Sequence, residues 1–473
     1  MKIRYMSDSL VGLHEKFKAV CPIKISYSQF AKLRPPYIKQ PCVSARDTCI
    51  CKKCENHKLL VSSAYNAGII STKNARELVN CLCCEKKGIE CLSRKCENCR
   101  DRLILFNEYE HDCPVTYHCW RSEKTERKPP KKSANVAKNA GNECEEKTKT
   151  ITVKVAIERP AHEIVDALGT SNQEYMAHLY RIAHQYETLT KLKDNLTAND
   201  LVLHVDFSEN YQCKYASEVQ SMHFGGSRES ITLHTGIAYG LDFKESFCSI
   251  SDSERHDPSS IIAHIDPILE KHLALRPLIT KLHLIFDGPT TQYRNKTYFD
   301  LLTSYLPEKY RQLLLIMHNF SEPGHGKGGP DGVGGFLKNL ADDAVAHGFD
   351  VHNFEKFCAL LEANVNGVHL EKVTADAISR VDNCVNKELK PFVGTMKVRQ
   401  LRWSKENRHD IFFNTLSCFE CELGKPCVHF GMNKQPWKTD EKTGITTGKK
   451  AVKRSCHSLP ADKTKRVKRA KNV

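Results

Sequence analysis

Residues 201–211 read LVLHVDFSENY, and this stretch decides the fold that we expect for the chain. Its first seven residues are rich in large aliphatic side chains, which is typical of a buried β-strand. Asp206 stands inside that strand between Val205 and Phe207, where a carboxylate is costly to bury unless it is paired or bound to a metal. The stretch therefore predicts a strand that carries a functional acid.

The elements predicted on either side of this strand follow a defined order. An amphipathic helix over 173–196 precedes it. The elements predicted after it are strands over 230–239 and 245–251, a helix over 258–275, a strand over 282–286, a helix over 297–305, a strand over 312–318 and a helix over 333–347. Three strands followed by alternating helices and strands predict an α/β fold with a mixed sheet. This order of elements is the one found in an RNase H-like core.

Further acids fall where such a sheet would gather them. Asp287 follows the predicted fourth strand in KLHLIFDGPTTQYRNK, and Glu322 and Asp331 flank the glycine-rich turn of FSEPGHGKGGPDGVGGFLK. The first and fourth strands of this order are parallel neighbours, so Asp206 and Asp287 would meet at one edge of the sheet. The candidate catalytic acids are therefore Asp206, Asp287 and a third one, either Asp331, which we prefer, or Glu322.

Converging carboxylates suit phosphodiester chemistry with two metal ions. Mg²⁺ or Mn²⁺ takes oxygen ligands, and two such ions about 3.5–4 Å apart activate the attacking oxygen and stabilise the leaving one. Each acid also has a structural alternative: an ion pair for Asp206, a turn for Asp287 and a helix N-cap for Asp331. The coincidence of all three in one topology favours the metal site.

Polar residues near these acids are candidates for contacts with a nucleic-acid backbone. Arg294 and Lys296 stand at the start of a predicted helix, which is a favourable place for phosphate. His325 and Lys327 stand in the glycine-rich turn, where backbone N–H groups also suit phosphate, with a solvated turn as the alternative. The turn matches neither a P-loop nor a Rossmann fingerprint, so we expect no small-molecule substrate.

Twenty-two cysteines are concentrated in two blocks, with fourteen between Cys21 and Cys144 and four between Cys418 and Cys456. In an intracellular chain, clustered C-x-x-C pairs with nearby histidines indicate zinc. The predicted zinc ligands are Cys51, Cys54, Cys96 and Cys99 as one set, and Cys418, Cys421, Cys427 and His429 as another. Further ligands in the first block, whose pairing stays open, are Cys49, His57, Cys81, Cys83, Cys84, Cys91, His111, Cys113, His118 and Cys119.

The net charge of +15 favours a polyanionic partner such as DNA, with solubility alone as the alternative. Beyond residue 441 the chain carries eleven Lys and Arg against one acid, which predicts a disordered basic arm for DNA binding or nuclear import. No apolar run approaches the roughly 20 residues of a membrane span, and no signal peptide begins the chain. We therefore expect a nuclear protein without a membrane anchor, and we leave homo-oligomerisation open.

Composition divides the chain into five segments. The expected domains are a Cys-rich zinc-binding module over 1–120, a charged linker over 121–150, an RNase H-like catalytic domain over 151–400, a C-terminal zinc-binding segment over 401–435 and a disordered basic tail over 436–473. The class is thus α/β with a mixed sheet, flanked by small zinc-binding modules.

Several strings resemble a known group of proteins. DFSENY (206–211), FDGPTTQYRNK (286–296) and GHGKGGPDGVGG (324–335) resemble the signature segments of animal proteins derived from DNA transposons, with DDE-type, RNase H-like transposase domains. The strings FAKLRPPYI (30–38), CICKKCENH (49–57) and LSCFECELGKPC (416–427) resemble the same group, so that the resemblance covers about 25–430.

The resemblance implies a cut-and-paste transposase domain, or a host protein made from one. Such a domain is a nuclease and strand transferase: it activates water to nick DNA and then lets a 3′-hydroxyl attack the target. Asp206 and Asp287 match the first two acids of this group, and Asp331 or Glu322 matches the third. The main alternative is a catalytically silent, domesticated protein that binds zinc and DNA or chromatin, and a zinc-dependent interaction scaffold ranks last.

Overall fold

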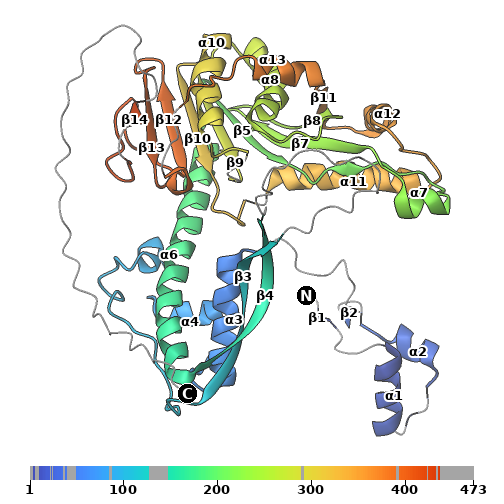
Figure 1. Cartoon of the computed structure of the whole chain (residues 1–473), viewed down its shortest axis with the longest axis vertical. Coiled ribbons are helices and arrows are strands. Elements are labelled where there is room, and N and C mark those ends of the chain that lie inside the picture. The colour runs from blue at the N-terminus through green and yellow to red at the C-terminus, as the bar shows by residue number, and fades with distance from the viewer. Residues whose placement is uncertain are drawn as a thin grey trace, which may run out of the picture.

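The computed structural model describes residues 50–436 with gaps at 85–87, 127–147, 289–291, 327, 390–393, 423 and 433–434, and also 4–5 and 10–39 with gaps at 22, 24 and 36–37. Two lobes are joined by the long helix α6, Ala161–Asp194 (Figure 1). The sheet lobe contains a ten-stranded mixed sheet, and the Cys-rich lobe packs around the first half of α6. No helix among the described residues combines the length and apolarity that a bilayer crossing requires.

The large sheet is built around β5. Its strands in spatial order are β11 (Val368–Lys372), β8 (Lys244–Ser251), β7 (Ser230–Tyr239), β5 (Asp200–Phe207), β9 (Lys281–Phe286), β10 (Leu315–Phe320), β12 (Gln400–Ser404), β13 (Asp410–Asn414) and β14 (Gln435–Pro436), with β6 (Tyr211–Gln212) beside β7. Strands β5, β9 and β10 are parallel, whereas β7 is antiparallel to β5 and β8. The α/β class with a mixed sheet is confirmed.

Helices cover both faces of this sheet. The elements on the first face are α8 (Pro258–Leu275), α9 (Lys296–Asp300), a π-helical turn (Leu301–Tyr305), α10 (Leu306–Lys309) and α13 (Ala375–Asp382). Those on the second face are α11 (Gly329–Ala346), α12 (Phe354–Asn364) and the second half of α6. Because strand side chains alternate between faces, Leu203 and Val205 of β5 enter the first core, and Val202 and Asp206 face the second side.

Most of the predicted elements around β5 are confirmed. Strand β7 and helix α8 have the predicted bounds, and β5, β8 and β9 differ from prediction by one residue at one end. Helix α11 begins four residues earlier than predicted, at Gly329, because Pro330 suits a first helical turn and Asp331 accepts a hydrogen bond from the Gly328 N–H at 2.8 Å. Helix α6 begins at Ala161, twelve residues before the predicted start.

The Cys-rich lobe buries a small core of its own. The helices of this lobe are α3 (Lys52–Asn66), α4 (Ala75–Cys81) and α5 (Ile89–Leu92). Val61 and Leu78 pack with Ile164 and Leu168 of α6, and all four side chains are buried. The remaining described elements are the paired strands β1 (Arg4–Tyr5) and β2 (Ile38–Lys39), α1 (Leu10–Val20), α2 (Tyr27–Lys32) and a 3₁₀ turn (Thr395–Lys397).

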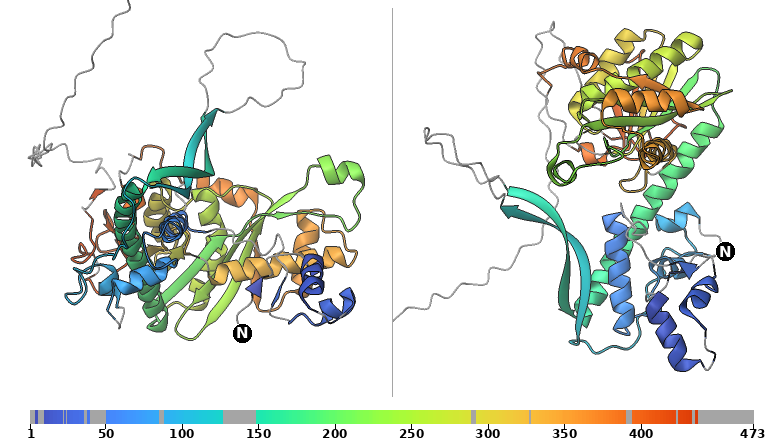
Figure 2. Two further views of the ribbon diagram at one scale, coloured as in Figure 1. Left: turned by 90° about the horizontal axis from the view of Figure 1, so that it is seen from below. Right: turned by 90° about the vertical axis from the view of Figure 1, so that its right-hand side faces the viewer.

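Part of the predicted linker forms a β-ribbon. Strands β3 (Pro114–Glu126) and β4 (Thr148–Pro160) pair antiparallel over their whole length and project from the Cys-rich lobe (Figure 2). The prediction of a linker over 121–150 was therefore wrong at both ends, and 127–147 lies outside the described residues. In β4 every second residue from Ile151 to Ile157 is aliphatic, which is the alternation of a strand, whereas the second half of β3 is polar and charged.

The predicted C-terminal zinc segment, 401–435, is part of the sheet lobe. Strands β12 and β13 extend the sheet beyond β10, and a buried hydrogen-bond network joins them to β10 and α6. The side chains of this network are Gln185, Asn319, Gln400, Asn414 and Ser417. The segment is therefore integral to the sheet lobe, and the predicted tail beyond 436 lies outside the described residues.

Buried histidines make the stability of the sheet lobe depend on pH. His234, His264 and His318 are completely buried, and burial lowers the pKa of each. Below pH of about 6.5 the unfolded chain binds protons that the folded chain excludes, so stability is lost as the pH falls. We expect the free energy of unfolding to fall by about 2–4 kcal/mol between pH 7.5 and pH 5.5, as measured by urea titration.

Two variants test whether a buried histidine, rather than an exposed one, causes this pH dependence. His318 lies between Phe286 and Phe320, so His318→Phe fits an aromatic environment and should flatten the pH dependence. His347 is exposed, and His347→Gln should leave the slope unchanged. Equal slopes in the wild type and in His318→Phe would contradict the prediction.

Candidate metal centres and acidic site

Asp206 and Asp287 occupy matching positions next to neighbouring strands. In the parallel register of β5 and β9, Val205 pairs with Phe286, and an acid follows each of these two residues. Val205 and Phe286 both point into the core beneath α8. Since successive side chains alternate, Asp206 and Asp287 are placed on the second face, toward α11.

Electrostatic interactions bring Asp331 into the same group. Burial raises the pKa of Asp206 to about 7, and the negative charges of Asp287 and Asp331 contribute to this rise. Burial also raises the pKa of Asp287, and Asp331 adds to this effect, while the Arg294 guanidinium opposes it. The candidate acidic site is therefore formed by Asp206, Asp287 and Asp331, whose oxygens are not all within 4.8 Å of one another.

Glycines let the loop between β10 and α11 lie directly on this site. A Cβ atom on Gly326 would lie 3.1 Å from the Cβ and Cγ atoms of Asp287. A Cβ atom on Gly328 would lie 2.9 Å from the His204 ring. The glycine-rich sequence thus allows a close approach of backbone to the acids, and larger residues at these positions would push the loop away.

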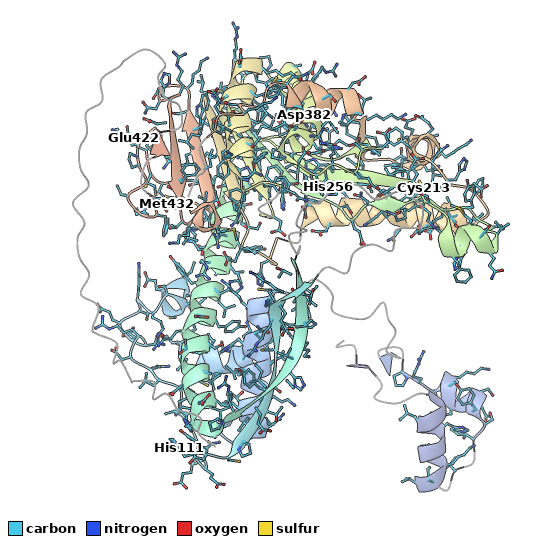
Figure 3. All side chains as sticks on the ribbon, in the orientation of Figure 1. His111, Cys213, His256, Asp382, Glu422 and Met432 are labelled. Carbon is cyan, nitrogen blue, oxygen red and sulfur yellow. The ribbon has the colours of Figure 1, made fainter. Side chains whose placement is uncertain are left out.

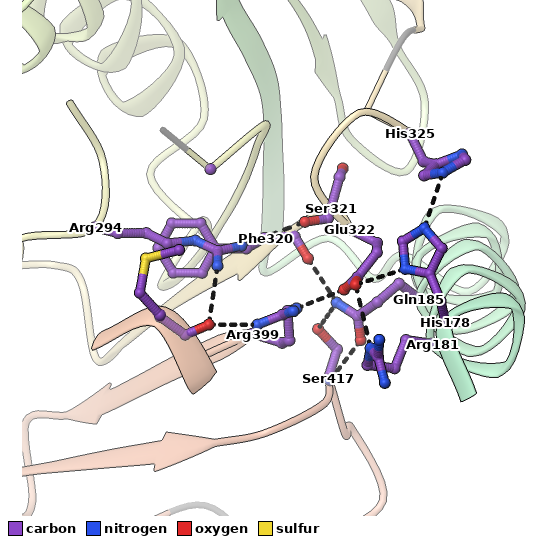
Figure 4. Close-up of polar contacts among 12 residues, drawn as sticks. His178, Arg181, Gln185, Arg294, Phe320, Ser321, Glu322, His325, Arg399 and Ser417 are labelled. Carbon is purple, nitrogen blue, oxygen red and sulfur yellow. Dashed lines mark hydrogen bonds and ion pairs between the residues drawn. The ribbon is translucent and has the colours of Figure 1, made fainter. Parts of the chain in front are cut away.

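Glu322 has a different environment from the three aspartates. It is 2% exposed and accepts hydrogen bonds from His178 Nδ1 at 3.0 Å, Arg181 Nε at 3.1 Å and Arg399 Nε at 2.8 Å (Figure 4). These donors hold the pKa of Glu322 well below its usual range. Asp331 acts electrostatically on Asp206 and Asp287, whereas the Glu322 oxygens are held by these donors, so Asp331 stays the preferred third acid.

A first metal-ligand group lies between the lobes. Cys51 Sγ is 3.3 Å from His178 Nε2, Cys54 Sγ is 3.5 Å from His325 Nε2, and the two Nε2 atoms are 3.2 Å apart. All four ligand atoms lie within 4.8 Å of one another. Two sulfurs and two imidazole nitrogens at these separations could hold a tetrahedral ion such as zinc.

Two further cysteine groups could also hold zinc. Cys84, Cys91, Cys96 and Cys99 form one group in the Cys-rich lobe. Cys418, Cys421, Cys427 and His429 form the other group. Its Cys421 Sγ atom lies 3.7 Å from Cys418 Sγ and 3.5 Å from Cys427 Sγ. The predicted C-terminal grouping is confirmed, whereas the predicted sharing of one ion by Cys51, Cys54, Cys96 and Cys99 is wrong.

The other proposed ligands of the first block have various positions. His57 is buried, stacks on Tyr175 and contacts Ser171 Oγ at 2.9 Å. His111 belongs to an exposed group with Asp112 and His162 at the far end of the Cys-rich lobe (Figure 3). Four cysteines and one histidine stand outside the groups found among the described residues: Cys81, Cys83, Cys113, Cys119 and His118. Cys49 lies outside the described residues.

Three of the four residues that were predicted to contact phosphate have their partners inside the protein. Arg294 is 1% exposed, stacks on Phe320 at 4.4 Å and donates to backbone carbonyls, so its prediction as a DNA contact was wrong. Lys296 donates to the Leu389 carbonyl, and His325 belongs to the first metal-ligand group. Lys327 lies outside the described residues.

A cavity of 210 Å³ opens beside the glycine-rich loop and supplies a cation that the sequence did not indicate. Lys193 at the end of α6 lines it, with Nζ 3.4 Å from His204 Nδ1 and 4.8 Å from the centre of the Tyr239 ring. Burial and the neighbouring Lys244 lower the pKa of Lys193. In the sequence, Lys193 looks like an ordinary charge at a helix end.

Comparison with known families identifies two matches. A model described as a domain of unknown function (DUF8701) matches residues 185–411, and another domain of unknown function (DUF8699) matches residues 1–42. None of the curated proteins and none of the solved structures matches the chain. The longer match covers the three aspartates and begins inside α6, so it leaves Cys51, Cys54 and His178 outside.

Proposed function

We propose that this chain is a nuclease and strand transferase that acts on DNA phosphodiesters with two divalent metal ions, in the manner of a DDE-type transposase. The observation that carries the proposal is the convergence of Asp206, Asp287 and Asp331 on one face of the sheet. The strand order β8-β7-β5-β9-β10, with β7 antiparallel to its neighbours, supports an RNase H-like core.

The three aspartates suit Mg²⁺ or Mn²⁺. Carboxylate oxygens are the ligands that these ions prefer, and Asp206, Asp287 and Asp331 would hold them. Two such ions supply activation of water or a 3′-hydroxyl and stabilisation of the leaving oxygen. Without cations the three carboxylates repel one another in a partly buried site, which agrees with the raised pKa values of Asp206 and Asp287.

The experiment is a nicking assay with the full chain, purified with its zinc retained. Supercoiled plasmid should be nicked in Mg²⁺ or Mn²⁺ but not in Ca²⁺, whose looser coordination suits binding rather than this reaction. No nicking of plasmid or linear duplex in either metal would overturn the nuclease proposal. Salt-dependent DNA binding without cleavage would then favour the silent DNA- or chromatin-binding alternative.

DNA as the partner and the nucleus as the location belong to the same proposal. The net charge of +15 supports a polyanionic partner, and the basic stretch beyond 441 supports nuclear import. Zinc in the three Cys-containing groups would stabilise the parts of the fold that carry their ligands.

Lys193 provides a prediction about substrate binding. It lines the cavity that the glycine-rich loop shares, and Gly326 of this loop lies against Asp287, so a cation there suits a phosphate that flanks the scissile bond. Lys193→Gln should weaken DNA binding about five- to tenfold and reduce the salt slope by about 0.9, as measured by fluorescence anisotropy in Ca²⁺.

Lys191→Gln is the matched control for that measurement. Lys191 is on the same helix but is 70% exposed and pairs with Glu187 at 2.7 Å. Its removal should change DNA affinity less than twofold, on the order of an exposed ion pair. Equal losses in the two variants would mean that the cavity does not contact DNA.

A further inference from the structure

We propose that a zinc ion bound by Cys51, Cys54, His178 and His325 ties the two lobes together and fixes the loop that carries Asp331. The zinc site itself is independent of the proposed function, whereas its effect on the acids rests on it. The four ligands come from three separate parts of the fold: the start of α3, the middle of α6 and the loop after β10. An ion there would link these parts directly.

The donor set is suited to zinc rather than to Mg²⁺ or Ca²⁺. Two thiolates and two imidazoles are ligands that zinc prefers, and two thiolates neutralise the charge of one Zn²⁺. Cys54 is 8% exposed and His178 is 1% exposed, whereas Cys51 is half-buried and His325 is exposed, so an ion there would be shielded from solvent on one side. Neutrality helps on that side because a net charge is costly next to buried groups.

Glu322 gives this site an outer layer. The His178 Nδ1–H group donates to Glu322 Oε1, which leaves Nε2 free to bind an ion and fixes the ring orientation. Glu322 is held in turn by Arg181 of α6 and by Arg399 next to β12 (Figure 4). A carboxylate that orients a ligating histidine in this way is typical of built zinc sites.

The loop from Glu322 to Asp331 connects the zinc ligands to the acids. His325 precedes Gly326, whose backbone rests on Asp287, and Asp331 bonds to the Gly328 N–H. A tie at His325 therefore restrains both the backbone that covers Asp287 and the helix turn that presents Asp331. The other two cysteine groups are confined to 84–99 and 418–429, and neither includes this loop.

The test compares three variants of the full chain. His325→Ala removes one ligand, His325→Cys restores a zinc ligand, and Cys96→Ser disturbs the separate group of the Cys-rich lobe. Zinc content is measured by mass spectrometry, and loop protection over 322–331 by hydrogen exchange. The wild type should hold about three zinc ions per chain. His325→Ala should hold one fewer and lose loop protection, whereas His325→Cys should match the wild type.

The Mg²⁺ dependence of cleavage gives the functional readout. His325→Ala should raise the half-saturating Mg²⁺ concentration at least about tenfold, since misplaced ligands weaken a metal site by about 10- to 100-fold. His325→Cys and Cys96→Ser should change it less than about twofold. Full zinc content in His325→Ala, or an equal effect of Cys96→Ser, would overturn the proposal. Zinc content and loop protection decide the matter even if the chain cuts no DNA.

Discussion

Asp206→Asn should lower the rate of metal-dependent cleavage by at least about a thousandfold, because a neutral amide is a much weaker ligand for Mg²⁺ or Mn²⁺ than the carboxylate that would hold the ions. The same change should stabilise the metal-free protein by about 1–2 kcal/mol at pH 8. The raised pKa of Asp206 means that its ionisation is disfavoured in the folded state, so the charge costs stability above pH of about 4. The neutral amide removes that cost.

Single-turnover cleavage of a labelled duplex and urea unfolding in EDTA measure the two effects. Asp342→Asn is the control, since Asp342 is an exposed acid of α11 that pairs with Lys214 outside the acidic site. Its cleavage rate should stay within about twofold of the wild type. Cleavage that survives Asp206→Asn would refute the assignment, and lost stability would mean that Asp206 is paired rather than repelled.

The largest effect on stability should come from the group of Cys418, Cys421, Cys427 and His429. Structural zinc sites in small peptides contribute apparent free energies of about 10–16 kcal/mol at pH 7, so losing one ligand is costly. The loop that carries these ligands closes on the sheet, because the Cys418 N–H donates to Gln400 Oε1 in the buried network. We expect Cys418→Ala to destabilise the sheet lobe by at least about 4 kcal/mol, or about 10 °C in its melting temperature.

Differential scanning calorimetry with and without added zinc measures this loss. Cys384→Ala serves as the control, because Cys384 is exposed and belongs to none of the metal-ligand groups among the described residues. It should melt within about 1 °C of the wild type. A melting temperature of Cys418→Ala that equals that of the control would show that this group holds no structural ion.

The central strands could be predicted from sequence because their local pattern agrees with their environment. Strand β7 is a run of aliphatic and β-branched residues that is buried on both faces. Helix α8 begins at Pro258, and the preceding Asp257 caps it by accepting a hydrogen bond from the Ser260 N–H. The pairing of β3 with β4 could not be predicted, although β4 alternates like a strand, because the two strands lie on either side of a long charged segment. Pairing over that distance leaves little trace in local composition.

The zinc groups also include one that sequence spacing could reveal and one that it could not. Cys418 to His429 fall within one turn-rich segment, so spacing alone revealed them. The partners of Cys51 and Cys54 could not be found by spacing, because His178 is in the middle of a helix and His325 in a glycine-rich turn. The packing of α3 against α6 and the position of the loop after β10 together bring these residues into one group. Arg294 was misjudged for a related reason, since sequence cannot show that a helix start faces the protein interior.

Helix α6 has a practical consequence for work with pieces of this chain. A recombinant fragment cut at the domain-family limits, 185–411, would sever α6 and discard His178 and Arg181, the two partners that Glu322 has on that helix. It would also lose Ser417 and most of β13, so the edge of β12 that pairs with β13 would be left open. Such a truncation should aggregate, whereas a piece spanning 50–436 keeps every described ligand with its neighbours.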